Sequence, residues 1–190
     1  MCIICEEGNI SNLTMLDCSG CTSLTSLPDL SGLVNLRMLY CDGCTNLTFL
    51  PDLSGLVNLR ELDCSGCTNL TSLPELSGLV NLGLLDCRGC TSLTSLPELS
   101  GLVNLTGLYC SYCTSLTSLP DLSGLANLRV LYCSGCTWLN HNNPDFDGNA
   151  KKLVLLQKNL RRIRFKRQIT KRHYLKKVLY TDLVKMVLQY

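Results

Sequence analysis

Residues 36–58 read LRMLYCDGCTNLTFLPDLSGLVN, and residues 59–81 repeat them almost unchanged as LRELDCSGCTNLTSLPELSGLVN. The unit reads Leu-x-x-Leu-x-Cys-x-x-Cys-Thr-x-Leu-Thr-Ser-Leu-Pro-x-Leu-Ser-Gly-Leu-x-Asn and spans 23 residues. It starts six times, at Leu13, Leu36, Leu59, Leu82, Leu105 and Leu128. Repetition at a fixed period of about 20–50 residues is typical of solenoids and other repeat arrays. The repeats therefore decide the organisation of the chain.

Each unit opens with a short alternating pattern. In the second unit Leu39 and Cys41 alternate with Met38, Tyr40 and Asp42, which predicts a short strand with Leu39 and Cys41 pointing inward. A proline in the following segment ends the strand, and leucines then recur every third residue around a glycine. That spacing favours a tight 3-10-like turn over a full helix. Six stacked units would bury a continuous Leu/Cys core about 30 Å long with ends that need caps.

The unit resembles the leucine-rich repeat, over about residues 4–139. The family's Leu-x-x-Leu-x-Leu-x-x-Asn/Cys motif is present with Cys in place of the third Leu and Cys at the Asn position. It is similar to the cysteine-containing repeats of plant immune receptors and to the repeat arrays of giant DNA viruses. The resemblance implies an α/β solenoid: an arc with a parallel concave sheet of about six short strands and an irregular or 3-10 convex side.

Charge and composition divide the chain in two. Residues 1–139 carry 4 Lys/Arg and 12 Asp/Glu, a net of −8, whereas residues 140–190 carry 13 and 3, a net of +10. We expect a solenoid of a half repeat and six units over 1–139, and a linker with a basic helical cap over 140–190. The hydrophobic fraction of 46% excludes a disordered chain. The longest apolar run, residues 153–156, is too short for a bilayer span.

No signal sequence is visible at the N-terminus, because residues 1–5 run straight into Glu6 and Glu7 without a basic region ahead of an apolar one. A cytoplasmic or otherwise intracellular location is therefore expected.

The C-terminal segment predicts two amphipathic helices. Leu153, Leu156, Leu160 and Ile163 fall on one helical face, and a second apolar stripe runs over residues 175–190. The basic side includes Arg161, Arg162, Arg164, Lys166 and Arg167. Three uses are open: a cap on the last repeat, which we favour, a site for an anionic partner such as nucleic acid or a membrane surface, and a docking helix for another protein.

Six Cys-x-x-Cys pairs admit three interpretations: packed core thiols, disulfides between coils, and zinc thiolates. We favour packed, reduced thiols without metal. The first Cys of each pair replaces a core Leu, and the second stands where a ladder residue bonds the backbone of the next turn. Cys2 and Cys5 fall outside both columns and are the expected reactive thiols.

The units differ mainly at positions that point outward from the strands. The resulting candidate partner-binding residues are Tyr40, Glu61, Asp63, Asp86, Tyr109 and Tyr132, together with Arg37, Arg60 and Arg129. Tyr, Asp and Arg on a rigid sheet are typical of a protein-binding face, although drift at exposed positions gives the same pattern. A second acidic column follows the prolines and is expected to be a solvated rim: Asp29, Asp52, Glu75, Glu98 and Asp121.

The sequence favours a binding module over an enzyme. The histidines, His141 and His173, lie in the linker and tail, and no phosphate loop or metalloprotease motif is present. We therefore predict a non-enzymatic protein-interaction module that binds a partner on the concave face, with no cofactor and no metal. The alternatives are an adaptor that acts through its basic tail, and a zinc-thiolate repeat protein.

Overall fold

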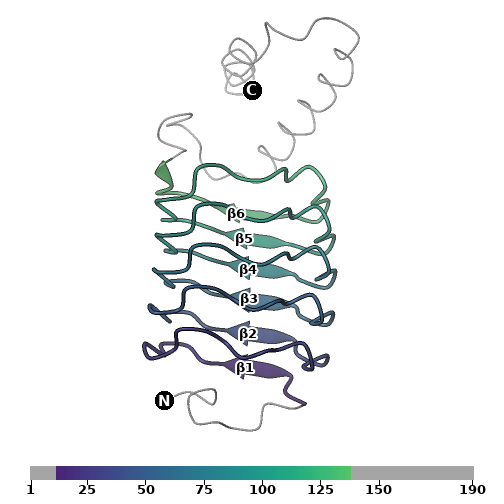
Figure 1. Ribbon diagram of the computed structural model, residues 1–190. Helices are drawn as coiled ribbons and strands as arrows, with labels where there is room; N and C mark the ends of the chain where they lie inside the picture. Colours follow the sequence, from purple (N-terminus) through teal and green to yellow (C-terminus); the bar gives the residue numbers. More distant parts are fainter. Residues whose placement is uncertain (1–11, 138–190) are drawn as a thin grey trace, which may run out of the picture.

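The computed structural model describes residues 12–137, which form a solenoid of stacked coils (Figure 1). Each coil contributes one three-residue strand to a single six-stranded sheet. The strands are β1 (Met15–Asp17), β2 (Met38–Tyr40), β3 (Glu61–Asp63), β4 (Leu84–Asp86), β5 (Gly107–Tyr109) and β6 (Val130–Tyr132). They lie in chain order and each pair is parallel, as the repeat predicts.

In every pair of adjacent strands, the paired residues are 23 positions apart in the sequence. Leu39 of β2 lies opposite Leu16 of β1 and Leu62 of β3, and the same pairing continues to β6. Equivalent residues of successive units therefore stand side by side. This register turns sequence columns into columns on the molecular surface.

The core consists of leucine and cysteine columns that run the length of the solenoid. The central strand residue is a buried Leu in every coil, and both cysteines of every pair are buried. Leu30, Leu33 and Leu36 close the first coil against the same core. Because one coil has no second layer to cover its leucines, burial comes from the neighbouring coils.

The segment opposite the sheet is built of tight turns. The N–H of Leu33 donates to the carbonyl of Leu30, and that of Leu36 to Leu33, each at 2.9 Å. These three-residue steps confirm tight turns in place of a helix.

Side-chain ladders bond the irregular backbone from coil to coil. The amide of Asn58 donates to the carbonyl of Val34 at 2.9 Å, and Asn81, Asn104 and Asn127 repeat the bond one coil further each time. Threonine hydroxyls form similar bonds, as from Thr137 to the carbonyl of Thr114 at 2.7 Å. These bonds give partners to carbonyls that regular sheet pairing does not reach.

Several sequence predictions fall outside the described residues: the cap and helices of 140–190, the thiols of Cys2 and Cys5, and the N-terminal half repeat. Among residues 12–137, no helix has the length and apolar character needed to cross a bilayer.

Candidate functional site: the outer face of the sheet

Two side-chain columns project outward from the sheet, one at each end of the strands. The first residues of the strands form one column: Met15, Met38, Glu61, Leu84, Gly107 and Val130. The last residues form the other: Asp17, Tyr40, Asp63, Asp86, Tyr109 and Tyr132. We call this surface the sheet face. It carries the residues that vary most among otherwise similar units.

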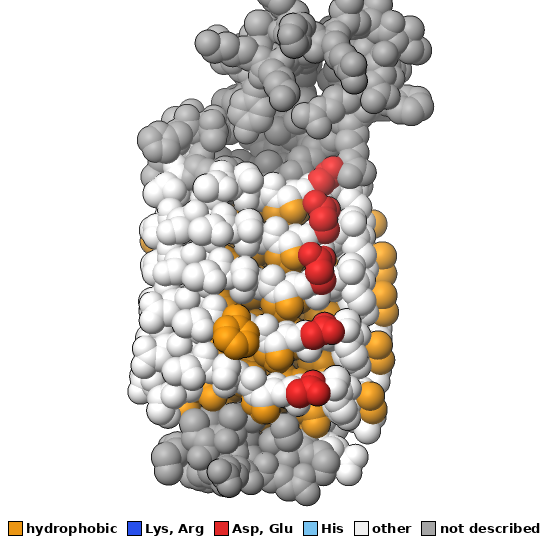
Figure 2. Space-filling model, viewed as in Figure 1, with side chains coloured by type: hydrophobic (Ala, Val, Ile, Leu, Met, Phe, Trp, Pro, Cys, Tyr) orange, Lys and Arg blue, Asp and Glu red, His pale blue; other side chains and the backbone are white. Residues whose placement is uncertain are grey.

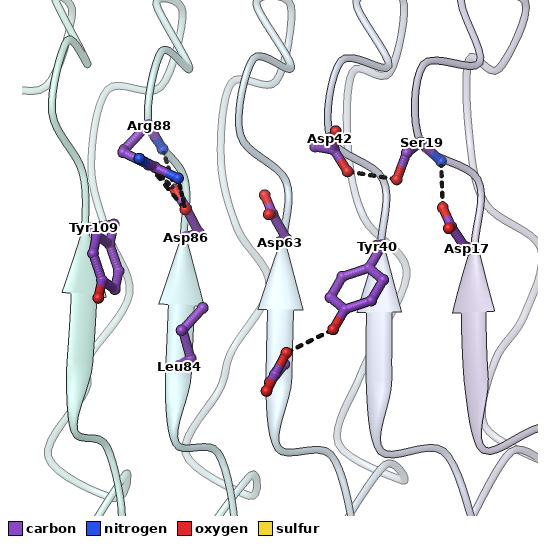
Figure 3. A pocket seen from close by; sticks show the side chains of 10 residues that line it. Asp17, Ser19, Tyr40, Asp42, Asp63, Leu84, Asp86, Arg88 and Tyr109 are labelled. Atoms are coloured by element: carbon purple, nitrogen blue, oxygen red, sulfur yellow. Dashed lines mark hydrogen bonds and ion pairs between the residues drawn. The ribbon is translucent and has the colours of Figure 1, made fainter.

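The sheet face contains a groove of about 560 Å³ that crosses β1 to β5 (Figure 3). Its lining residues are Asp17, Ser19, Tyr40, Asp42, Glu61, Asp63, Leu84, Asp86, Arg88 and Tyr109. Five of the predicted partner-binding residues are thus brought together: Tyr40, Glu61, Asp63, Asp86 and Tyr109. Asp17 and Leu84 are further strand residues, whereas Ser19, Asp42 and Arg88 extend the groove past the ends of the strands.

The part of the groove over β1 to β3 is acidic. The hydroxyl of Tyr40 donates to Oε2 of Glu61 at 2.6 Å, and this bond to a carboxylate raises the pKa of Tyr40 to about 12. On the neighbouring coils the hydroxyl of Ser19 donates to Asp42. Burial raises the pKa of the half-buried Asp63, although the backbone N–H of Ser65 donates to its carboxylate at 2.9 Å.

Over β4 the groove holds an ion pair. Nη2 of Arg88 lies 2.6 Å from Oδ2 of Asp86, and Nε of Arg88 donates to both carboxylate oxygens. The arginine covers Asp86, which is only 4% exposed. The prediction that Asp86 is an exposed outward residue is wrong in its exposure, because Arg88, two positions later, folds back over it.

The part of the groove toward β6 is aromatic. The guanidinium of Arg88 lies 5.4 Å from the ring centre of Tyr109, whose ring in turn packs 5.3 Å from that of Tyr132. Gly107 makes room for this arrangement, since a Cβ there would lie 2.8 Å from the Tyr109 ring. Tyr132 lies beside the groove and remains 54% exposed.

The predicted arginines Arg37, Arg60 and Arg129 do not line the groove. They are exposed at the position before each strand. Their role in partner binding, as a third column beside the two strand columns, stays a prediction. The candidate anionic-partner residues Arg161, Arg162, Arg164, Lys166 and Arg167 lie outside the described residues.

A further variable column belongs to the site and was not among the predicted site residues. It lies between the two cysteines of each unit and reads Ser19, Asp42, Ser65, Arg88, Ser111 and Ser134. Ser19, Asp42 and Arg88 of this column line the groove. The sequence does contain a signal for this column, because Asp42 and Arg88 are charged where the other units have serine.

The cysteine columns serve as hydrogen-bonding core residues. The thiol of Cys44 donates to the carbonyl of Cys18 at 3.0 Å, and Cys67 donates to Cys41 in the same way. The bond therefore runs to the preceding coil, not onward to the next one as predicted. The first cysteines bond forward, as from Cys41 to the carbonyl of Asp63 at 3.3 Å.

The environment of the thiols suppresses ionisation in most of the first cysteine column. A neighbouring thiol and burial raise the pKa of Cys41 and Cys64 well above the ordinary value, and burial raises that of Cys44 to about 11. Two thiols of the second column differ: hydrogen bonds with Cys41 and Cys87 lower the pKa of Cys67 and Cys113, respectively. Within residues 12–137 no three potential metal ligands converge.

The second acidic column lies outside the groove and is visible as a line of acidic side chains in Figure 2. We call it the acidic rim: Asp29, Asp52, Glu75, Glu98 and Asp121. Asp29 is exposed and accepts from the backbone N–H of Ser31 at 2.9 Å, which lowers the pKa of Asp29. The same bond recurs between Asp52 and Ser54, so at both positions the acid caps a turn.

Residues 11–56 and 57–101 each match the family model of leucine-rich repeats. Residues 11–101 are thus identified as leucine-rich repeats. The match agrees with the parallel sheet and stacked coils of residues 12–137. Leucine-rich repeats commonly act as protein-interaction modules and typically lack enzymatic activity. No curated protein matches the chain significantly.

Solved structures of leucine-rich-repeat proteins are similar to parts of this chain. The leucine-rich repeat domain of the type III effector XopL is 32% identical, with a TM-score of 0.42, over 61% of this chain and 51% of that one. YopM from Yersinia enterocolitica is 30% identical, with a TM-score of 0.45, over 63% of this chain and 23% of that one. The chain thus spans about half of the first protein and under a quarter of the second.

Proposed function

We propose that this protein is a non-enzymatic interaction module that binds a partner protein across its sheet face. The observation that carries the proposal is the groove, which is lined mainly by positions that differ between nearly identical units. Duplicated coils supply an invariant scaffold, and the variable columns supply a surface specific to this chain.

The side chains in and beside the groove are those expected of a binding face. Tyr109 and Tyr132 form a packed aromatic pair with one member half exposed, and aromatic residues of this kind are frequent binding hot spots. The partner is expected to cover Tyr132 and to meet the carboxylates of Glu61 and Asp63. The cysteines of residues 12–137 are all buried, and most of their thiols donate to backbone carbonyls, as Cys67 does to Cys41 and Cys113 to Cys87.

A photo-crosslinking residue in the full chain tests which face is used. We would place the same photoreactive phenylalanine analogue at Tyr132 or, as a matched control, at Phe49. The two side chains are 54% and 52% exposed, and Phe49 lies outside the six-stranded sheet. A partner from cell extract should crosslink from position 132 and not from position 49. Equal capture from both positions would refute the sheet face as the site.

The captured partner then allows an affinity measurement. Replacing Tyr109 and Tyr132 by Ala should weaken binding by about 2 kcal/mol or more, with the melting temperature nearly unchanged because both side chains lie outside the core. Leu39→Ala is the stability control, since its cavity in the core should cost about 2–5 kcal/mol. Unchanged affinity in the double tyrosine variant contradicts the proposal.

A further inference from the structure

The groove has an excess of negative charge that its one cation does not balance. Its acidic lining residues are Asp17, Asp42, Glu61, Asp63 and Asp86, and its basic lining residue is Arg88. Arg88 is held by Asp86 through three contacts to that carboxylate. Within the described residues the other four carboxylates accept hydrogen bonds from neutral donors only: Ser19, Tyr40 and Ser65.

Asp63 and Asp86 are register partners on adjacent strands, about 5 Å apart at the strand spacing. Glu61 begins the strand that Asp63 ends, and Asp42 lies on the preceding coil. Asp63 is half-buried between the coils that carry Asp42 and Asp86. Like charges in a partly desolvated groove repel one another, so a cation that enters it gains more than it would at an exposed acidic surface.

The groove already shows how it accommodates a guanidinium. Arg88 forms a fork with the carboxylate of Asp86 while its guanidinium lies over the ring of Tyr109 (Figure 3). Arginine favours this combination of a carboxylate and an aromatic face. Tyr40 beside Glu61 and Asp63 offers a second such combination, and no arginine of residues 12–137 lies there.

The chain itself carries a basic segment complementary to this groove. Residues 1–139 have a net charge of −8 and residues 140–190 a net of +10. Nine of the basic residues fall within 161–177: Arg161, Arg162, Arg164, Lys166, Arg167, Lys171, Arg172, Lys176 and Lys177.

Chain length allows the segment to reach the groove. Residue 161 follows the last described residue, Thr137, by 24 positions. That many residues span up to about 80 Å when extended, whereas β6 and β1 are separated by only about 24 Å at the strand spacing. A tether of this length also holds the segment at a high effective concentration, on the order of millimolar.

We propose that the basic segment 161–177 docks in cis on the sheet face, with its cations against Asp42, Glu61 and Asp63. In this state the segment occupies the acidic part of the groove. It thereby competes with an outside partner, and this regulatory consequence rests on the function proposed above.

Zero-length crosslinking of the full chain tests the docking directly. A carbodiimide joins a carboxylate to a lysine amine only in contact, and peptide mass spectrometry locates the bond. Lys166, Lys171, Lys176 or Lys177 should link to the groove carboxylates at low ionic strength. The links should disappear at about 1 M salt, where the Debye length is about 3 Å. Mixing isotope-labelled and unlabelled chains should give links within one copy only. Links between copies, or links to the acidic rim, would overturn the proposal.

Trypsin provides a second readout, because it cleaves after the lysines and arginines that the groove would cover. The triple variant Asp42→Asn, Glu61→Gln, Asp63→Asn should raise the initial cleavage rate within 161–177 several-fold. The matched control Asp29→Asn, Asp52→Asn, Glu75→Gln makes the same change in charge on the acidic rim and should leave the rate unchanged. Equal rates in the two variants would refute docking in the groove.

The two proposals fail separately. Protected tail and groove crosslinks, with no partner captured from position 132 either in the full chain or in a full-length variant whose basic residues within 161–177 are replaced by Gln, would refute the interaction function and leave the docking standing. Partner capture from position 132 with an unprotected tail would refute the docking alone.

Discussion

At the residue scale, the titration of Asp63 is set by its position among neighbouring coils. Burial raises its pKa, so folding favours the protonated form and ionisation lowers the free energy of unfolding. This destabilisation is present above the folded pKa and is lost as the pH falls through it. Asp63 thus contributes least to stability near neutral pH.

We therefore predict that Asp63→Asn raises the free energy of unfolding at pH 7. The gain should shrink as the pH falls toward about 4, the ordinary aspartate value, because the wild-type carboxyl then becomes neutral as well. Urea unfolding at several pH values measures the difference. Asp29→Asn is the control: the pKa of Asp29 is lowered by its bonds to Ser31, so the variant should not gain stability. A gain at pH 7 that does not shrink on acidification would contradict this account of Asp63.

The reactivity of each thiol likewise depends on the burial and the pKa of the individual cysteine. The chain has 14 cysteines, of which the structure describes 12, all buried. Burial limits reagent access, and at Cys41 and Cys64 the raised pKa also suppresses the thiolate.

We predict that a thiol reagent at neutral pH labels only Cys2 and Cys5 in the native chain and the remaining cysteines on unfolding. Mass spectrometry of the labelled peptides measures this before and after denaturant. Rapid labelling of the column cysteines in the native protein would show that the coils open or that the thiols are exposed.

At the element scale, the turn between the paired cysteines requires a left-handed backbone. Gly20, Gly43, Gly66, Gly89 and Gly135 have φ between 67° and 75°. Tyr112 stands at the equivalent position of the fifth unit with φ of 61°. Residues with a Cβ are disfavoured in this region by about 1–2 kcal/mol. Glycine in this turn therefore stabilises the coil through its backbone.

Gly66→Ala should lower the free energy of unfolding by about 1–2 kcal/mol. The cost is conformational, because the nearest atom to the new Cβ would lie at an ordinary 3.5 Å. Gly32→Ala is the matched control, since Gly32 has no positive φ and no atom within 4 Å of an added Cβ. Denaturant unfolding measures the free energy of unfolding of both variants. Equal values would show that the positive φ of Gly66 is not what makes its replacement by Ala destabilising.

At the scale of the whole molecule, stability comes from contacts between adjacent coils. Each strand pairs only with its sequence neighbours, and the Asn, Thr and Cys ladders likewise join adjacent coils. Solenoids of this kind behave as sums of unit and nearest-neighbour terms. The length of the array is therefore adjustable in whole units.

Deleting residues 59–81 should leave a folded, shorter solenoid. The deletion joins Asn58 to Leu82 and so preserves the register of every remaining unit. The denaturant m-value should fall by roughly one part in six, since less surface is exposed on unfolding. Deleting residues 59–69 is the control, because loss of half a unit leaves one coil unable to close. Circular dichroism and urea unfolding distinguish the two, and a loss of fold in both deletions would contradict nearest-neighbour stability.

Repetition and alternation in the sequence are enough to define the coil, its period and the two outward columns. A buried leucine every 23 residues and the alternation about Leu39 leave one register in which every core residue is covered. The same period is sufficient to place Tyr109 next to Tyr132, because the two residues are one repeat apart. These features follow from local pattern and repetition alone.

The way in which the columns combine into a site depends on packing between the folded coils. The fold of Arg88 over Asp86, the room that Gly107 leaves for Tyr109 and the exclusion of Arg37 from the groove depend on side-chain direction. Period and alternation fix which face a residue occupies, whereas the path of its side chain depends on neighbours in adjacent coils. The scaffold could therefore be predicted from the sequence, while the boundaries of the groove and the pairing of its charges required the packed coils.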